Sequence, residues 1–168
     1  EIDAQSSLIS LSFPIPKLTP QDSSYLDLLG MILIGALDVL IYSACLLAGA
    51  DIGSVNFTPV VTDGSSTLII SLHVNKSQIA AAWSALLNSL GQLGRQPVSS
   101  RQLERAKDLL ENQTILMSES LSGQARRIGF FSSRWPAQNA LKLYGRTAYG
   151  ATSAQLFSFT RSLFFNPA

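Results

Sequence analysis

The stretch Val98–Gly129, VSSRQLERAKDLLENQTILMSESLSGQARRIG, is the part of this sequence that says most about its fold. Ser99 and Gln102 form the pattern of a capping box, which gives a helix a defined start. The residues that follow at spacings of three and four form one mostly apolar stripe, as expected for an amphipathic helix: Leu103, Ala106, Leu110 and Gln113.

A polar break and a second helix are predicted after this stripe. Three serines crowd the junction (Ser118, Ser120 and Ser122), and their hydroxyls compete with the backbone for hydrogen bonds. Ala125, Ile128 and Gly129 then share one helix face. Because these side chains are mostly small, we expect that face to pack closely against a neighbour.

The composition indicates one folded domain with a sizeable core. The chain has 168 residues, of which 46% are hydrophobic and 14% charged, so neither a disordered nor a fibrous protein is expected. It opens without Met and moves at once into an apolar strand pattern, so we interpret it as a piece of a longer protein.

The charges are divided unevenly between the two parts of the chain. Residues 1–94 hold two basic and seven acidic side chains, net −5, and residues 95–168 hold ten basic and four acidic, net +6. The basic residues are scattered along helical patterns, which is typical of solvated helix faces. We therefore expect no nucleic-acid partner.

A strand, two helices, two strands joined by a turn and a further helix are predicted in the first part of the chain. Ser6–Phe13 is the first predicted strand, and Asp22 or Ser23 is expected to cap the helix after its proline-rich link. Further predicted elements are a helix over Asp38–Ala48 after a cap at Gly35, strands over Ile52–Val61 and Thr67–Val74 joined by a turn at Asp63-Gly64, and a helix over Ser77–Leu93.

The helix over Ser77–Leu93 is strongly amphipathic. Its predicted buried face consists of Ile79, Trp83, Leu86, Leu87, Leu90 and Leu93. Trp83 should then be buried against the sheet, and Trp83→Ala should cost about 3–5 kcal/mol.

Two more helices are predicted near the end, over Ala137–Tyr144 and Ser153–Phe164, the latter with a capping box at Thr152 and Gln155. The aromatic residues there (Phe157, Phe159, Phe164 and Phe165) are at helical spacing, which favours core packing. The fold class predicted is α+β: an antiparallel sheet with helices packed on one face.

The segment Leu28–Ala50 is long and apolar enough to span a bilayer, because its 23 residues contain one charge, Asp38. A carboxylate near the centre of a span costs about 2.5–3.5 kcal/mol. Glycines interrupt the segment, and no Lys or Arg lies near enough to orient it. We predict two buried helices and no membrane span, and keep a membrane-inserted segment as an alternative.

Three short motifs in order resemble the second domain of the pitrilysin-type zinc metallopeptidases, the family of the mitochondrial processing peptidase and insulin-degrading enzyme. They are Leu103–Lys107 (LERAK), Glu119-Ser120, and A-x-x-I-G over Ala125–Gly129. The resemblance implies a processing-peptidase-like fold over residues 1–168 as a single domain, without the first strand and helix usual for such a domain.

The family's chemistry resides in an H-x-x-E-H helix whose histidines bind zinc. This chain has one histidine, His73, which we expect at the surface, and one cysteine, Cys45, which we expect to be a small buried hydrophobe. No catalytic residue, metal ligand or cofactor is therefore predicted here, and zinc is expected only in a partner domain. Phosphate-binding loops and the G-x-S-x-G hydrolase motif do not occur.

Non-catalytic domains of the family contact substrate through an Arg and a Tyr seven positions apart. Aligning Ile41-Tyr42 with the family's Leu-Tyr puts Leu46 at the Arg position and Gly53 at the Tyr position. Both polar groups are missing, so these two substrate-contact positions are degenerate. We expect this face to be apolar and to contact a helix or a partner domain, so that Leu46→Arg would bury an unpaired charge and destabilise the domain.

The leading hypothesis is a non-catalytic, inactive domain of a pitrilysin-type zinc metallopeptidase. It would form the structural half of a peptide-enclosing chamber and dock on a zinc-bearing catalytic domain or subunit of the same family, with peptide as substrate. The alternative is a free-standing module that binds an extended peptide along a sheet edge.

Overall fold

The computed structural model of the chain describes residues 6–15, 17–35, 40–61, 66–135 and 139–165. The described residues form a three-stranded antiparallel sheet and seven α-helices, which confirms the predicted α+β class. The elements in chain order are β1 (Ser6–Ile15), α1 (Pro20–Ile34), α2 (Leu40–Leu47), β2 (Ile52–Val61), β3 (Ser66–Asn75), the 3₁₀ turn η1 (Lys76–Gln78), α3 (Ile79–Arg95), α4 (Ser100–Ser118), α5 (Leu121–Arg134), α6 (Ala140–Gly150) and α7 (Ser153–Phe164).

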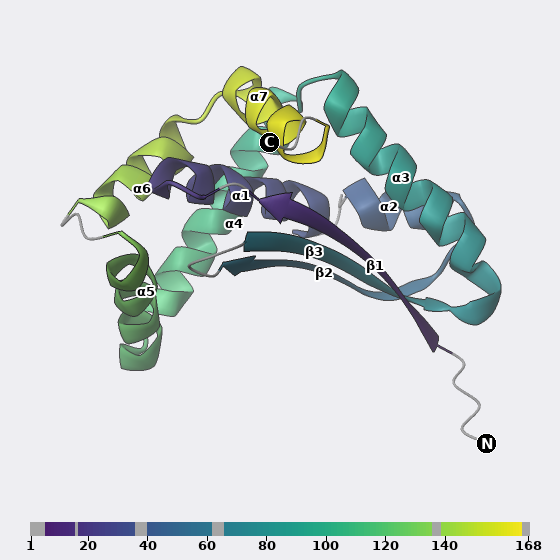
Figure 1. Cartoon of the computed structure of the whole chain (residues 1–168), viewed down its shortest axis with the longest axis horizontal. Helices are drawn as coiled ribbons and strands as arrows, with labels where there is room; N and C mark the ends of the chain where they lie inside the picture. The colour runs from purple at the N-terminus through teal and green to yellow at the C-terminus, as the bar shows by residue number, and fades with distance from the viewer. Residues whose placement is uncertain (1–5, 16, 36–39, 62–65, 136–138, 166–168) are drawn as a thin grey trace.

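The sheet has the order β1-β3-β2, so β3 is its central strand. Pro14 and Pro59 lie in the two outer strands, where a missing backbone N–H interrupts the ladder least. Figure 1 shows helices on one side of an arched sheet and none on the other, with α5 extending past the level of the strands at one end.

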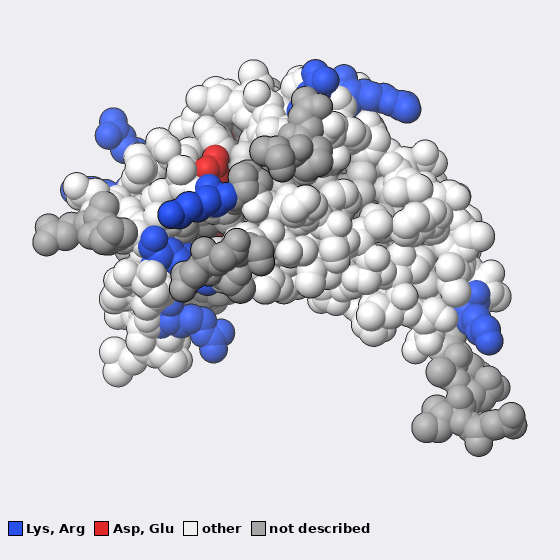
Figure 2. All heavy atoms as spheres, in the orientation of Figure 1, with Lys and Arg blue, Asp and Glu red and all other residues white. Residues whose placement is uncertain are grey.

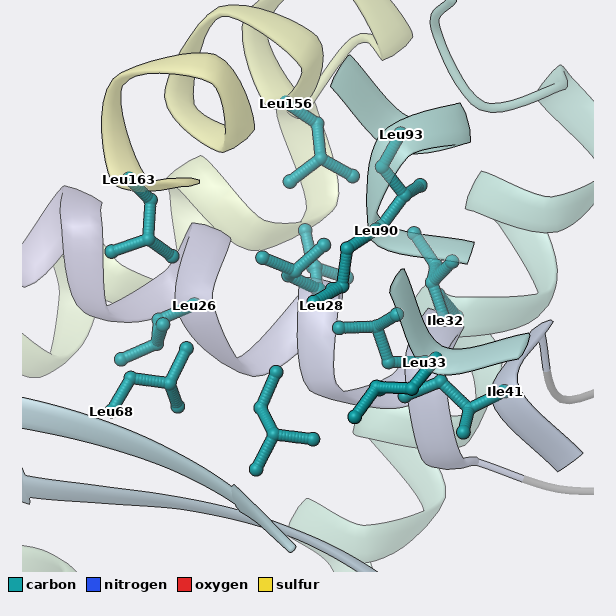
Figure 3. Packing of buried hydrophobic residues seen from close by; sticks show 14 of the residues in the cluster. Leu26, Leu28, Ile32, Leu33, Ile41, Leu68, Leu90, Leu93, Leu156 and Leu163 are labelled. Atoms are coloured by element: carbon teal, nitrogen blue, oxygen red, sulfur yellow. The ribbon is translucent and has the colours of Figure 1, made fainter. Parts of the chain in front are cut away.

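The core is formed where α1, α3 and α7 meet the covered face of the sheet (Figure 3). Strand β3 alternates strictly, and Leu68, Ile70, Leu72 and Val74 are buried. Helix α1 is buried on most of its circumference because α4 and α6 pack against it as well. This all-round burial explains why its sequence is apolar without a clear stripe.

Several helix boundaries follow the predicted caps. The capping boxes of Ser99 with Gln102 and of Thr152 with Gln155 are both formed, at the starts of α4 and α7. The expected cap of α1 at Asp22 or Ser23 is wrong: Thr19 is the N-cap, and Asp22 is its reciprocal partner three residues later. Pro20 fits this earlier start because proline is favoured in the first helical turn.

Some segment limits also differ from the prediction. Strand β1 continues through Pro14 to Ile15, and α6 begins at Ala140 and runs on to Gly150. The predicted turn at Asp63-Gly64, the helix start at Asp38 and Ala137 lie outside the described residues. Helix α2 ends at Leu47, and in the turn that follows Gly49 has a φ of 75°, a left-handed conformation that glycine adopts without strain.

The predicted buried face of α3 is wrong at three of its six positions. Leu86, Leu90 and Leu93 are buried, but Trp83 is 39% exposed, and Ile79 and Leu87 are exposed as well. The buried face is rotated toward small residues, Ala82, Ala85 and Ser89, because α2 approaches α3 closely on that side. Hydrophobicity alone could not reveal a contact made through alanines.

The predicted close-packing face of α5 is also wrong. Ala125 and Gly129 are exposed, and Ile128 is 58% exposed. Phe131 is the only residue of this helix that is buried, because α5 packs chiefly on α4 and projects away from the sheet and the other helices. Within the described residues, no helix is long and apolar enough to cross a membrane.

Candidate functional site

The uncovered face of the sheet is uncharged. No Asp, Glu, Lys or Arg occurs in β1, β2 or β3. Antiparallel register aligns the alternate side chains in rows across the three strands: Ser10, Ser71 and Asn56 in one, and Ser12, Ile69 and Thr58 in the next. This face therefore offers hydroxyl and amide groups to a partner, without charge selectivity.

Charged side chains lie elsewhere on the molecule. Figure 2 shows several Lys and Arg side chains near α5 and few acidic ones on the same face, while the central surface carries almost no charge. The basic character of the second part of the chain is thus partly concentrated at the end of the molecule where α5 projects.

A cavity of about 450 Å³ lies between α1, α4, α5 and the end of β2. Its apolar lining includes Leu26, Leu110, Met117, Phe130 and Phe131. Its polar lining includes Asp27, Gln113, Thr114, Arg126, Arg127 and Tyr144. A mostly apolar cavity of this size with a few converging polar groups is typical of a ligand site.

One wall of the cavity holds a hydrogen-bonded pair. The Tyr144 hydroxyl donates to Oδ2 of Asp27 at 2.6 Å, joining α6 to α1 over 117 positions of sequence. Burial raises the pKa of Asp27 to about 6, although the hydrogen bond from Tyr144 acts in the opposite direction. A carboxylic acid with a pKa in this range gains or loses its proton near neutral pH.

Tyr144 itself stays protonated. Burial raises the pKa of its phenol first, and the adjacent charge and hydrogen bond of Asp27 raise it further. The Arg127 guanidinium lies near enough to lower the pKa of Tyr144, but burial and the effects of Asp27 outweigh it.

Aromatic contacts hold α5 at the cavity. The Phe131 ring packs edge-on against Tyr144, with centroids 5.2 Å apart, and also contacts Trp135. The indole N–H of Trp135 donates to the Leu18 carbonyl at 3.0 Å. The Arg134 guanidinium lies 4.0 Å from the centre of the Phe130 ring. The Phe131 contact thus ties the end of α5 to α6, and the Trp135 hydrogen bond ties it to the segment that precedes α1.

Comparisons of the sequence with models of protein families and with curated proteins find no match. Solved structures do match. A protease from Helicobacter pylori superposes with a TM-score of 0.85 at 14% identity, over 98% of this chain and 40% of that one.

Two further structures match over nearly the whole of this chain. The inactive peptidase domain of a protein described as a zinc protease, from Bordetella parapertussis, gives a TM-score of 0.78 at 15% identity, over 94% of this chain and 86% of that one. Pitrilysin gives 0.67 at 14% identity, over 96% of this chain and 17% of that one.

This chain has the fold of a pitrilysin-type peptidase domain. That confirms the fold expected from the resemblance. At these identities the likeness is one of fold. The chain also spans less than half of the Helicobacter protease and of pitrilysin, whose remaining parts have no counterpart here.

Within this pitrilysin-type fold, the two predicted substrate-contact positions lie at the surface. Leu46, on α2, is 62% exposed, so no helix of the described residues covers it, and its contact with a partner domain stays a prediction. Gly53 lies at an irregularity in β2, beside the backbone of His73, and a Cβ there would meet nothing closer than 3.9 Å. Neither position lines the cavity.

The structure places the one histidine and the one cysteine of the chain as the sequence predicts, at the surface and in the core. His73 is exposed on β3, whereas Cys45 is fully buried in α2 with its sulfur 4.0 Å from the Ala82 carbonyl. Burial raises the pKa of the Cys45 thiol. The described residues contain no group of three His, Cys, Asp or Glu side chains that could hold a metal ion.

The cavity and its Asp27–Tyr144 pair were not predicted from the sequence. A signal was present, since Asp27 is the one charged residue in the apolar stretch 25–34 of this helix. A carboxylate in such a helix needs a partner, but nothing in the sequence identified the partner as Tyr144.

Proposed function

We propose that this chain is a non-catalytic domain of a pitrilysin-type zinc metallopeptidase. It forms the structural half of a peptide-enclosing chamber and docks on a zinc-bearing domain. The observation that carries the proposal is the fold: its arched sheet has one uncovered face, and similar structures include an inactive peptidase domain.

The sequence supports the non-catalytic role. A catalytic zinc needs about three protein ligands, and the whole chain contains one histidine and one cysteine. His73 is followed by Val74, Asn75 and Lys76, so no H-x-x-E-H motif occurs. Zinc belongs in the partner domain under this proposal.

The surface supports a partner that covers part of this chain. Large apolar side chains are exposed on α2, α4 and α5, and Leu47 and Leu121 are 90% and 84% exposed. Apolar side chains exposed to this extent mark contact surfaces when they lie together. Leu46 belongs to this set, so we propose that it contacts the partner domain and that positions 46 and 53 provide no polar group to substrate.

The uncovered face of the sheet supports peptide as the enclosed molecule. Its serine, threonine and asparagine side chains can donate hydrogen bonds to peptide groups and accept them. Because the strands carry no Asp, Glu, Lys or Arg, this face does not select the side chains of the peptide by their charge. We further propose that residues 1–168 correspond to most of one such domain, lacking the initial strand and helix.

Reconstitution tests the proposal. The 168-residue chain is co-expressed with an H-x-x-E-H domain encoded in the same or an adjacent reading frame. We expect a one-to-one complex by light scattering, and peptide hydrolysis that requires both parts. A Glu→Gln change in the partner's motif is the control that abolishes hydrolysis while the complex persists. A zinc domain that hydrolyses peptides equally well alone and never binds this chain contradicts the proposal.

A further inference from the structure

The cavity between α1, α4, α5 and β2 combines an apolar lining with an excess of positive charge, because two arginines and one carboxylate of the described residues line it. We propose that it binds the carboxyl terminus of a peptide whose last residue is apolar. The identification of the ligand as a peptide rests on the proposed function, and the remaining argument rests on the lining of the cavity itself.

The arginines of α5 provide the charge. Arg126 and Arg127 both line the cavity, and neither has an ion pair within the part of the chain that the structure describes. The carboxylate among the lining residues, Asp27, accepts its hydrogen bond from Tyr144 instead. The α5 wall thus carries two guanidinium groups that form no ion pair with the described residues and outnumber the one carboxylate of the cavity, an excess that complements a ligand carboxylate.

The apolar lining provides a place for the terminal side chain. Leu26 of α1, Leu110 and Met117 of α4, and Phe130 and Phe131 of α5 surround the space. A volume of about 450 Å³ accommodates a large side chain together with the backbone of its own and the preceding residue. Burial of an aromatic or long aliphatic side chain here drives binding, while the arginines fix its direction.

Asp27 favours a peptide over other apolar carboxylates. A carboxylate accepts several hydrogen bonds, and the structure gives Asp27 one within the described residues, from Tyr144. Its remaining acceptor sites suit the backbone N–H groups that a peptide brings and that a fatty acid lacks. The amide of Gln113 and the hydroxyl of Thr114 provide further partners along α4.

Calorimetric titration of the 168-residue chain tests the inference with two probes that differ in one group. Acetyl-Ala-Ala-Phe with a free carboxylate is compared with the same tripeptide as its carboxamide. We expect the acid to bind at least tenfold more tightly than the amide. Equal affinity for both, or no binding of the acid at millimolar concentration, overturns the inference.

Charge variants locate the site. Arg126→Gln with Arg127→Gln should reduce the affinity for the acid to that for the amide. Arg95→Gln with Arg146→Gln removes the same charge from exposed positions outside the cavity and should leave the affinity unchanged. Equal losses of affinity in both double variants mean that net charge alone affects binding, and they contradict the assignment of the site to Arg126 and Arg127. Circular dichroism confirms that both variants fold.

An apolar carboxylate can come from a peptide terminus or from a fatty acid, and decanoate represents the fatty acid. We expect it to compete more weakly than the tripeptide acid, and equal or stronger binding overturns the assignment to a peptide. The outcome is distinct from that of the reconstitution. A chain that assembles with a zinc domain but binds no tripeptide acid disproves only the carboxyl-terminus site, and the reverse result disproves only the proposed function.

Discussion

At the scale of single residues, Asp27 is the clearest case of a property created by folding. In the sequence it is the one charge in the apolar stretch 25–34, and in the structure it is hydrogen-bonded to Tyr144 at the wall of a cavity. Its raised pKa follows from burial, so its effect on stability depends on pH.

Asp27→Asn should increase the stability of the protein above pH 6. The folded protein has a pKa of about 6 at Asp27 against an ordinary value of 3.8. As the pH rises from 3.8 to about 6, Asp27 is ionised in the unfolded chain but still protonated in the folded protein. The rising pH therefore lowers the free energy of unfolding. Above pH 6 the loss is complete and amounts to about 2–3 kcal/mol, whereas asparagine still accepts from Tyr144 without carrying a charge.

Urea unfolding at pH 4 and pH 7.5 measures this effect. We expect Asp27→Asn to be more stable than the wild type at pH 7.5 and to lose that advantage at pH 4. Asp108→Asn, at an exposed position of α4, serves as the control and should show no such difference. A variant that is destabilised at pH 7.5 shows that the charged form of Asp27 is favoured in the fold.

Leu46→Arg should leave the stability of the isolated chain nearly unchanged. Because the leucine side chain is 62% exposed on α2, an arginine there remains solvated and buries no charge. Thermal unfolding should give a Tm within about 2 °C of the wild type. A loss of several degrees indicates that the position is covered, as the sequence had suggested. Ile41→Arg, at a fully buried position of the same helix, provides the contrast and should unfold the domain.

At the scale of elements, local signals determine where helices begin, and neighbours determine which face is buried. The capping boxes of α4 and α7 form as their sequences predict. The α3 face differs because alanines, which are weak hydrophobic signals, allow α2 and α3 to approach each other.

Trp83 and Leu86 test the corrected face of α3. Trp83→Ala should cost less than about 1.5 kcal/mol because the indole is already 39% exposed. Leu86→Ala should cost about 2–5 kcal/mol because this side chain is fully buried and its removal leaves a void. Chemical unfolding measures the free energy of unfolding of both variants. A larger loss for Trp83→Ala than for Leu86→Ala means that the face predicted from hydrophobicity is the buried one.

The capping box at the start of α4 provides a second test at this scale. Ser99→Ala removes the acceptor for the Gln102 backbone N–H and should cost about 1 kcal/mol. Ser100→Ala is the matched control, because it changes the next, exposed serine without touching the box. Equal effects on the free energy of unfolding contradict the assigned cap.

At the scale of the whole molecule, packing is uneven. Helix α1 is surrounded by the sheet and by other helices, whereas α5 projects and is held mainly through its end (Figure 1). Elements with few buried apolar contacts open locally at low free-energy cost. The cavity lies between these two helices, so its shape depends on how α5 is held.

Hydrogen exchange should rank the elements accordingly. We expect amides of β3 and α1 to exchange slowest and those of α5 to exchange fastest among the helices longer than ten residues. Phe131→Ala removes the buried anchor of α5 and should accelerate exchange in α5 while leaving β3 protected. Mass spectrometry of peptic fragments measures the exchange rates of α5 and β3 in one experiment. If Phe131→Ala accelerates exchange uniformly across the chain, α5 unfolds together with the core, contrary to the prediction.

The sequence by itself determined the strands, most helices, the capping boxes of α4 and α7, the buried state of Cys45 and the fold that the order LERAK, E-S, A-x-x-I-G implied. The strands, helices and caps depend on the local spacing of residues, whereas the fold followed from the resemblance to a known family. The tertiary structure decided the exposed state of Trp83 and Leu46 and the pairing of Asp27 with Tyr144. Each of these depends on which parts of the chain, distant in sequence, pack against each other. The periodicity of a segment shows which residues share a face but not which other segment covers that face.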